Sequence, residues 1–156
     1  MLRSVYSVIN RSPRHLLKEV ILVDDQSEIE EVKKPLDDYC KKHFGSIVKI
    51  LRAPKRLGLI AAKNYGGRYA TGDVIVFLDA HIEANAGWLE PILYRIKQKP
   101  NAVLCPTIDS IDDKTMAYHG SGDAGYGIFT WSLFFNWGSM PDRVRNQRKS
   151  HTDPYP

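Results

Sequence analysis

An apolar run that ends abruptly in polar residues constrains the fold of this chain most. In residues 74–81 (VIVFLDAH), five apolar residues precede Asp79, Ala80 and His81. Such a run is typical of a buried strand in a parallel sheet, and open α/β sheets place their ligands at the carboxyl ends of such strands. Because alternate residues of an extended chain project to one side, Asp79 and His81 can converge on one cation. A carboxylate and an imidazole together suit a borderline divalent ion such as manganese (Mn²⁺).

An ordinary turn at a strand end is the alternative interpretation, since short motifs often match by chance. Two further strand-like runs favour a site. Residues 19–25 (EVILVDD) end in carboxylates, and residues 47–52 (IVKILR) lead into a basic turn. Helix-length segments separate the three runs, which predicts βαβ units whose strands all end at one edge of the sheet. We therefore expect one crevice to collect Asp25, Arg56, Asp79 and His81.

Composition sets the broad class. With 156 residues, 43% of them apolar, the chain is long enough for one core and one domain. The net charge of +4 is modest, and we interpret the basic stretch 143–149 as a solvated loop, so no nucleic-acid partner is predicted. The chain itself contains neither a membrane-spanning apolar run nor a signal peptide. Cys40 and Cys105 are too few for a disulfide framework, and whether they pair stays open.

Apolar spacing predicts the remaining elements of the first hundred residues. Helices are expected at 2–9 (ending before Pro13), after Ser27 as a cap, at 59–70 and at 88–96, and a further strand at 102–105. Pro35 must lie near the start of the second helix or kink it. No strand precedes the first helix, so we expect a preceding strand to be missing from this sequence.

Short β-like pieces are expected beyond residue 110. Four glycines surround Asp123 without opening a helix after a buried strand, so they indicate turns rather than a nucleotide-binding loop. The aromatic run 129–137 is predicted to be a strand that buries Trp131 and Phe135 on one face. A membrane-interface element and a sugar-stacking platform are the alternatives. Residues 141–156 are polar and aperiodic, which favours a loop.

The motifs, taken in order, resemble those of the polypeptide N-acetylgalactosaminyltransferases. They are EVILVDD (19–25), LR (51–52), KRLGLI (55–60), ATGD (70–73), FLDAH (77–81), EAN (83–85), WLEPI (88–92), CP (105–106), ID (108–109), FTW (129–131) and FNW (135–137). The resemblance covers nearly the whole chain. It implies the α/β GT-A fold, a mostly parallel sheet flanked by helices, here incomplete. Residues 1–140 would be the donor- and metal-binding part of the catalytic domain, and 141–156 a loop leading to a missing second half.

The resemblance also implies an activity: retaining transfer of N-acetylgalactosamine (GalNAc) from UDP-GalNAc to Ser or Thr hydroxyls of proteins, with Mn²⁺, in the Golgi lumen. Asp79 and His81 match the metal ligands. Asp25 matches a position that contacts the uridine part, Arg56 matches a donor-contacting position, and Ala80 stands between the metal ligands where many relatives carry Ser. The chemistry fits, because a carboxylate accepts from uracil N–H or ribose hydroxyls and a guanidinium donates several hydrogen bonds.

Two features of the family are absent from this sequence: a Trp-Gly-Gly-Glu-Asn segment and the later His that completes the metal site. We therefore expect the donor-binding half of a transferase, inactive alone, with its acceptor-side catalytic residues unknown. A membrane anchor is expected only in the full-length protein. Two alternatives stay open, namely another metal-dependent GT-A transferase and a non-catalytic nucleotide-sugar-binding module derived from one.

Overall fold

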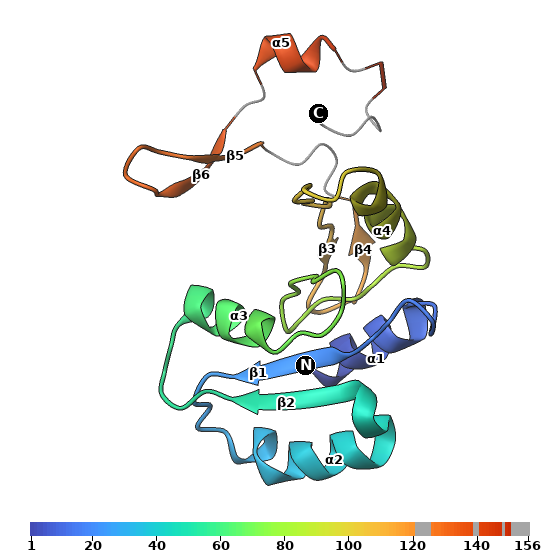
Figure 1. The fold of residues 1–156 in the computed structure, drawn as a ribbon, viewed down its shortest axis with the longest axis vertical. Helices are drawn as coiled ribbons and strands as arrows, with labels where there is room; N and C mark the ends of the chain where they lie inside the picture. The colour runs from blue at the N-terminus through green and yellow to red at the C-terminus, as the bar shows by residue number, and fades with distance from the viewer. Residues whose placement is uncertain (121–125, 139–140, 148, 151–156) are drawn as a thin grey trace. The chain divides into compact units, whose positions relative to one another are not determined.

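The computed structural model describes residues 1–120, 126–138, 141–147 and 149–150 (Figure 1). The chain divides into two compact units, Met1–Ala102 and Val103–Pro156. All of the predicted site residues belong to the first unit.

The first unit is built around a pair of parallel strands. Its elements are α1 (Leu2–Arg11), β1 (Val20–Asp24), the short 3-10 helix η1 (Glu30–Val32), α2 (Lys34–Phe44), the short 3-10 helix η2 (Gly45–Ile47), β2 (Val48–Arg52), α3 (Leu59–Arg68) and α4 (Leu89–Gln98). Val20 lies opposite Val48, and the register continues to Asp24 opposite Arg52. The predicted βαβ arrangement of the first two runs is confirmed, as are the helices expected at 2–9, 59–70 and 88–96.

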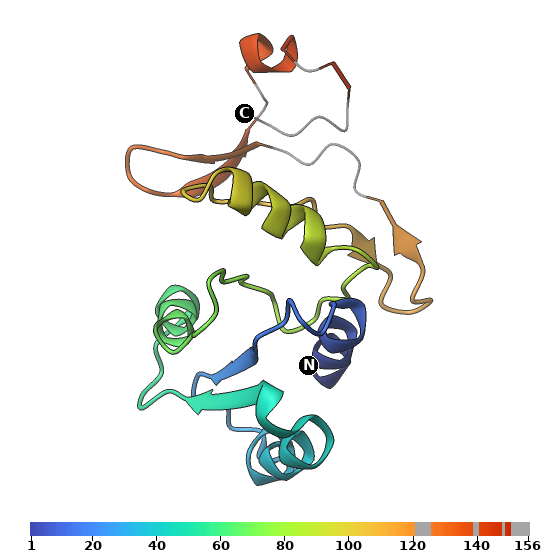
Figure 2. The same cartoon turned by 45° about the vertical axis from the view of Figure 1, so that its right-hand side comes forward.

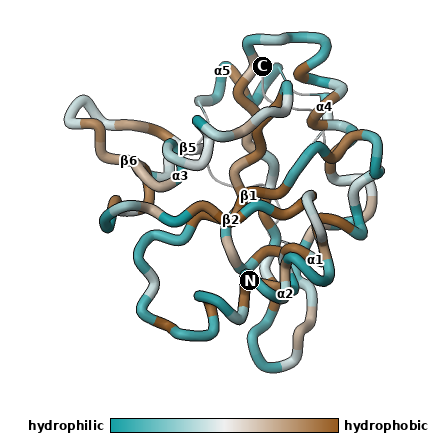
Figure 3. Tube along the Cα trace, turned by 60° about the horizontal axis from the view of Figure 1, so that its bottom comes forward, coloured by the Kyte–Doolittle hydropathy of each residue, from teal (hydrophilic) through white to brown (hydrophobic). Residues whose placement is uncertain are grey.

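The alternating side chains of β1 serve two faces. Val20 and Leu22 pack on a buried cluster formed by Val5, Leu36, Cys40 and Val48, whereas Val23 faces α3. There a Cβ built on Gly66 would lie 2.7 Å from Val23 Cγ2, so glycine permits the close approach of α3 to the strand. In Figures 1 and 2, α2 runs along β2 and α3 along β1. Figure 3 colours the apolar residues of both strands brown and their charged residues teal, in keeping with the sequences VILVD and VKILR.

Ion pairs close both ends of this strand pair. At the amino end, Glu19 meets Lys49 at 2.5 Å and accepts the Thr71 N–H at 2.6 Å. Lys49 first and then the Thr71 amide lower the pKa of Glu19 to about 2. At the carboxyl end, Asp24 pairs with Arg52 at 2.5 Å. Burial alone would raise the pKa of Asp24, but the hydrogen bonds from Ser27 and Arg52 outweigh it and leave the pKa lowered.

The third expected strand is not formed, and that prediction is wrong. Residues 75–79 carry no strand pairing, and Ile75, Phe77 and Leu78 are 47%, 55% and 40% exposed. A strand is defined by a hydrogen-bonded neighbour, and in the described ranges β1 pairs only with β2. Residues 102–105 likewise form no strand. The apolar residues in 75–79 and 102–105 indicate a tendency to be buried, but they do not provide the neighbouring strand that a β-strand must hydrogen-bond to.

Ser27 does not cap α2, which corrects a second prediction. Its backbone N–H donates to Asp24 Oδ1 at 2.8 Å, which makes it part of the turn that follows β1. The helix begins later, at Lys34, with Pro35 in its first turn. Proline lacks the N–H that interior helical positions need, so the start of a helix is the position that tolerates it.

The second unit contains short antiparallel pairs, as expected: β3 (Ser110–Ile111) with β4 (Tyr118–His119), and β5 (Tyr126–Phe129) with β6 (Phe135–Gly138). One helical turn, α5 (Asp142–Arg145), lies within the predicted loop. Of the glycine cluster, Gly122, Asp123 and Gly125 lie outside the described residues.

The aromatic run is a hairpin rather than the single half-buried strand that was predicted. Thr130 N–H donates to the Phe134 carbonyl and Leu133 N–H to the Thr130 carbonyl, both at 2.9 Å. This turn folds the run back on itself, with Leu133 at φ +62°. Trp131 at its tip is fully exposed and Phe135 is 55% exposed. Local aromatic content predicted β structure correctly, but the turn decided which side chains meet solvent.

Candidate donor and metal site

One large cavity of the first unit brings together most of the predicted site residues. We call it the site cavity; its volume is about 1480 Å³, and apolar residues of α1, β1, α4 and segment 74–78 form much of its wall. The predicted residues Asp25, Arg56, Asp79 and Ala80 all line it. His81, the next residue, is exposed and is not part of this lining. Four of the five predicted residues therefore share one space, while the role of His81 stays a prediction.

Asp25 fastens the end of β1 to the start of α3. Its Oδ1 accepts the Leu57 N–H at 2.6 Å, and its Oδ2 accepts the Gly58 N–H at 2.8 Å. Gly58 precedes α3 with φ +82°, a conformation that favours glycine. The carboxylate thus satisfies backbone donors at a helix start, where negative charge is favoured. Each oxygen keeps a second lone pair, so acceptor capacity remains for a ligand.

Arg56 lies in the turn that Asp25 holds. Its side chain is exposed and lines the site cavity. Because the two amides after Arg56 are fixed by one carboxylate, the base of its flexible side chain is fixed as well. The sequence predicted that Asp25 and Arg56 share one crevice, but it did not predict that Asp25 holds the turn of Arg56 through the Leu57 and Gly58 amides.

Lys63 is the cation that sequence reasoning missed. Its Nζ lies 3.3 Å from Asp79 Oδ1, with the two side chains 38% and 51% exposed. A signal for it existed in the helical spacing, because the residues of α3 that line the cavity recur every three or four positions: Leu59, Ala62, Lys63, Gly66 and Gly67. A lysine on that otherwise small and apolar face is the exception that points to the site.

The loop after Asp79 is tied to α1. Ser4 Oγ donates to the Ala80 carbonyl at 2.9 Å, and Ser7 Oγ accepts the Ala84 N–H at 2.7 Å. Trp88 Nε1–H donates to Ser12 Oγ at 3.1 Å. Contacts across more than 70 residues leave no trace in local periodicity, so the sequence offered no signal for them.

The side chains of Asp79 and His81 are of chemical types that bind divalent cations. Asp79 supplies carboxylate oxygen, His81 imidazole nitrogen, and the carboxylate already faces a positive charge in Lys63. In the described part of the chain, no group of three or more His, Cys, Asp or Glu side chains comes together as a metal site. That Asp79 and His81 hold the cation stays a prediction, and two protein ligands would leave other coordination positions open to a diphosphate.

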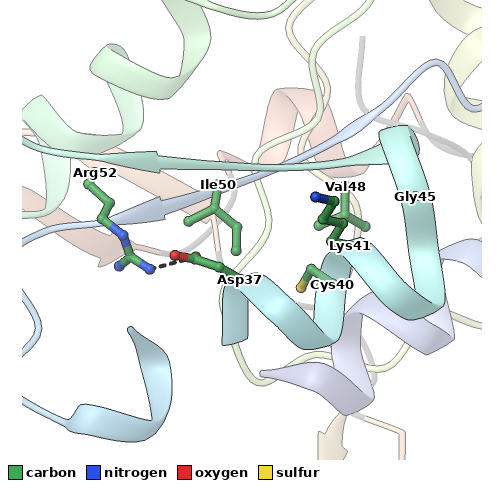
Figure 4. Close-up of a pocket in the computed structure, with 7 residues that line it drawn as sticks. All are labelled: Asp37, Cys40, Lys41, Gly45, Val48, Ile50 and Arg52. Atoms are coloured by element: carbon green, nitrogen blue, oxygen red, sulfur yellow. Dashed lines mark hydrogen bonds and ion pairs between the residues drawn. The ribbon is translucent and has the colours of Figure 1, made fainter. Parts of the chain in front are cut away.

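A second, smaller cavity of about 450 Å³ lies between α2 and β2 (Figure 4). Its charged wall is committed to the fold, because Arg52 binds Asp37 at 2.7 Å and the Val32 carbonyl at 3.2 Å besides Asp24. Cys40 in the same wall is a free thiol whose pKa is raised by burial, and Cys105 is also free. We assign this cavity a structural role.

The fold belongs to a known class of protein. A protein-family model described as "Glycosyl transferase family 2" matches residues 1–154, so the chain belongs to that family. Its described structure aligns with "Crystal structure of GalNAc-T7 with UDP, GalNAc and Mn2+" at a TM-score of 0.86 and 34% identity, over 99% of this chain and 29% of that one. The predicted GT-A fold is confirmed.

The particular relatives are N-acetylgalactosaminyltransferases. "Probable N-acetylgalactosaminyltransferase 9" of Caenorhabditis elegans is 51% identical over 153 residues, which cover 98% of this chain and 26% of the relative. "Polypeptide N-acetylgalactosaminyltransferase 13" of Homo sapiens is 50% identical over 149 residues, 96% of this chain and 27% of the relative. The predicted resemblance is confirmed, and the chain spans about a quarter of the length of these relatives.

Proposed function

We propose that this chain is the donor-binding part, residues 1–140, of a retaining polypeptide N-acetylgalactosaminyltransferase. The reaction would move GalNAc from UDP-GalNAc to Ser or Thr hydroxyls of proteins, in the Golgi lumen. The observation that carries the proposal is the shared cavity: Asp25, Arg56, Asp79 and Ala80 line one space in a chain about half identical to such transferases. None of the helices in the described ranges is long and apolar enough to cross a membrane.

The residues divide the work of binding the donor. Asp79 and His81 would hold Mn²⁺, which as a Lewis acid offsets the charge of the departing UDP diphosphate. Asp25 would accept hydrogen bonds from the uridine part with its remaining lone pairs, and Arg56 would donate to the donor. Ala80 has no hydroxyl, so only its backbone and methyl group can face the donor.

The experiment that tests the proposal measures donor binding and transfer separately. Calorimetry with UDP and UDP-GalNAc, with and without Mn²⁺, is expected to show binding that Mn²⁺ strengthens and that Asp79→Asn weakens. Asp38→Asn is the matched control, because it also breaks a Lys–Asp pair, Lys34–Asp38 at 2.9 Å, but on the surface of α2. Equal effects of the two substitutions would contradict the assignment of Asp79.

Transfer is then assayed by mass spectrometry with UDP-GalNAc, Mn²⁺ and a Ser/Thr-rich peptide. We expect weak UDP binding but no turnover from the 156-residue chain, since it spans about a quarter of the length of its relatives and alignment of the acceptor can be worth roughly 7 kcal/mol of the barrier. The product of the longest transcript that contains this chain is expected to turn over. Binding without turnover in that product would favour a non-catalytic module, and preference for a different sugar would favour another GT-A transferase.

A further inference from the structure

Three serines of the first helical region bond to the loop that carries the predicted metal ligands. We call Ser4, Ser7 and Ser12 the serine seam; Ser4 and Ser7 lie on α1 and Ser12 directly follows it. Their partners are the Ala80 carbonyl, the Ala84 N–H and the Trp88 indole N–H, at 2.9, 2.7 and 3.1 Å. The partners recur every four residues, so the seam holds the whole loop from 80 to 88 rather than one point of it.

Two of the three serines of the seam are buried, and Ser7 is half-buried. Ser4 and Ser12 are only 7% and 8% exposed, and Ala84 is 9% exposed. For these buried groups a lost partner leaves a polar group unsatisfied rather than solvated, so their bonds resist distortion. Serine is also a poorer helix former than alanine. The buried Ser4 within α1 therefore has a use outside the helix, and its hydroxyl bonds to the loop.

The position of the Ser4 bond matters most. Ala80 stands between Asp79 and His81, and its carbonyl belongs to the peptide group that joins Ala80 to His81. Fixing that carbonyl fixes the peptide plane next to His81 and so narrows the directions in which the His81 side chain can leave the backbone. Ser7 then fixes the far side of His81 through Ala84.

We propose that the serine seam positions the Asp79–His81 pair for the cation, an inference that rests on the proposed function. Ser4 and Ser7 are positioning residues, because they act through the backbone of the loop, at the Ala80 carbonyl and the Ala84 N–H. Outer groups that orient metal ligands typically change metal affinity 10- to 100-fold when they are removed.

The test compares Ser4→Ala and Ser7→Ala with two controls in the same chain. Asn10→Ala truncates an exposed polar side chain of α1, and Ser7→Thr keeps the hydroxyl. Amide hydrogen exchange over residues 79–88 measures how firmly the loop is held, without any ligand. Electron paramagnetic resonance titration with Mn²⁺ in the presence of UDP measures the affinity of the Asp79–His81 pair for the cation. Circular dichroism checks that α1 remains helical; should Ser4→Ala unfold, the half-buried Ser7→Ala carries the comparison.

We expect exchange of the Ala84 amide to accelerate about fivefold or more in Ser7→Ala, the scale of one lost hydrogen bond. Mn²⁺ should bind about tenfold more weakly to both alanine variants, whereas Ser7→Thr and Asn10→Ala should match wild type. Unchanged loop exchange in the alanine variants would overturn the seam while leaving the proposed function intact. If exchange is faster in the alanine variants but the wild-type chain binds no Mn²⁺, the seam holds the loop and the metal proposal is refuted.

Discussion

The segments 20–24 and 74–79 have similar sequences, each an apolar run ending in aspartate, yet only the first is a strand. Residues 20–24 pair with β2 and pack on both faces, and the Asp24 carboxylate is held by Arg52 at 2.5 Å. Residues 75–79 have no strand partner in the described ranges, and the half-exposed Asp79 carboxylate lies 3.3 Å from Lys63 Nζ. The difference separates a carboxylate used for stability from one available to a ligand.

The largest expected effect falls on the second segment and concerns activity. In the product of the longest transcript, Asp79→Ala or His81→Ala should lower Mn²⁺-dependent transfer by about 100-fold or more, because the departing diphosphate loses its Lewis acid. The midpoint of thermal unfolding should stay unchanged, because both side chains are exposed. Near-normal turnover with Mn²⁺ supplied would remove the residue concerned from the metal site.

Replacing Arg56 should have a smaller effect, and this effect should also fall on ligand binding rather than on stability. Arg56→Ala is expected to weaken UDP binding by about 1–3 kcal/mol, the scale of a lost hydrogen bond to a charged group. Arg68→Ala, at the exposed end of α3, is the control and should leave UDP binding unchanged. Equal UDP affinities of wild type and Arg56→Ala in calorimetry would make Arg56 a surface residue.

Two neighbouring glycines test the packing of the first segment. In Gly66→Ala the new Cβ would lie 2.7 Å from the stiff Val23 side chain, and overpacking of this kind costs about 1–3 kcal/mol. In Gly67→Ala the nearest atom, of the Phe77 ring, is 3.5 Å away, so the gain in helix propensity of up to about 1 kcal/mol should dominate. Urea unfolding should therefore give free-energy changes of opposite sign, and two changes of the same sign would contradict the close approach of α3 to β1.

Glu19 makes the strand pair sensitive to acid. Its folded pKa of about 2 lies below the ordinary 4.5, so its contribution to stability is fully present above about pH 4.5 and is lost as the pH falls toward about 2. Glu19→Gln should remove this part of the acid dependence, whereas the exposed Glu31→Gln should not. Unfolding curves between pH 7 and pH 2.5 that coincide in shape for wild type and Glu19→Gln would refute the assignment.

Lys63 should give the smallest effect. Replacing it by Met removes a positive charge beside Asp79 and should strengthen Mn²⁺ binding by less than about fivefold, because an exposed pair is worth up to about 1 kcal/mol. Lys34→Met, which breaks the surface pair with Asp38, is the control. Weaker Mn²⁺ binding in Lys63→Met would show that Lys63 assists the cation site instead of competing with it.

Much of the molecule could be predicted from its sequence. The apolar runs of β1 and β2 and the helical spacing of α1, α3 and α4 are local properties, because burial periodicity acts within one element. Pro35 left two possibilities for α2, a start or a kink, and the structure has the start at Lys34. One crevice was expected to collect Asp25, Arg56, Asp79 and His81, because the carboxyl ends of βαβ strands meet at one edge. Of these, Asp25, Arg56 and Asp79 line the site cavity, whereas His81 does not. The ordered motifs predicted the family.

Tertiary structure decided the rest. In the backbone, residues 75–79 have no strand partner, and the aromatic run forms a hairpin with Trp131 at its tip. Three contacts join distant parts of the chain: Asp25 with the Arg56 turn, Lys63 with Asp79, and Ser4 with Ala80. Each of these depends on which partner stands opposite a group. A hydrogen bond or ion pair between residues far apart in the chain is fixed by how the elements pack, whereas sequence periodicity records only which face each element buries.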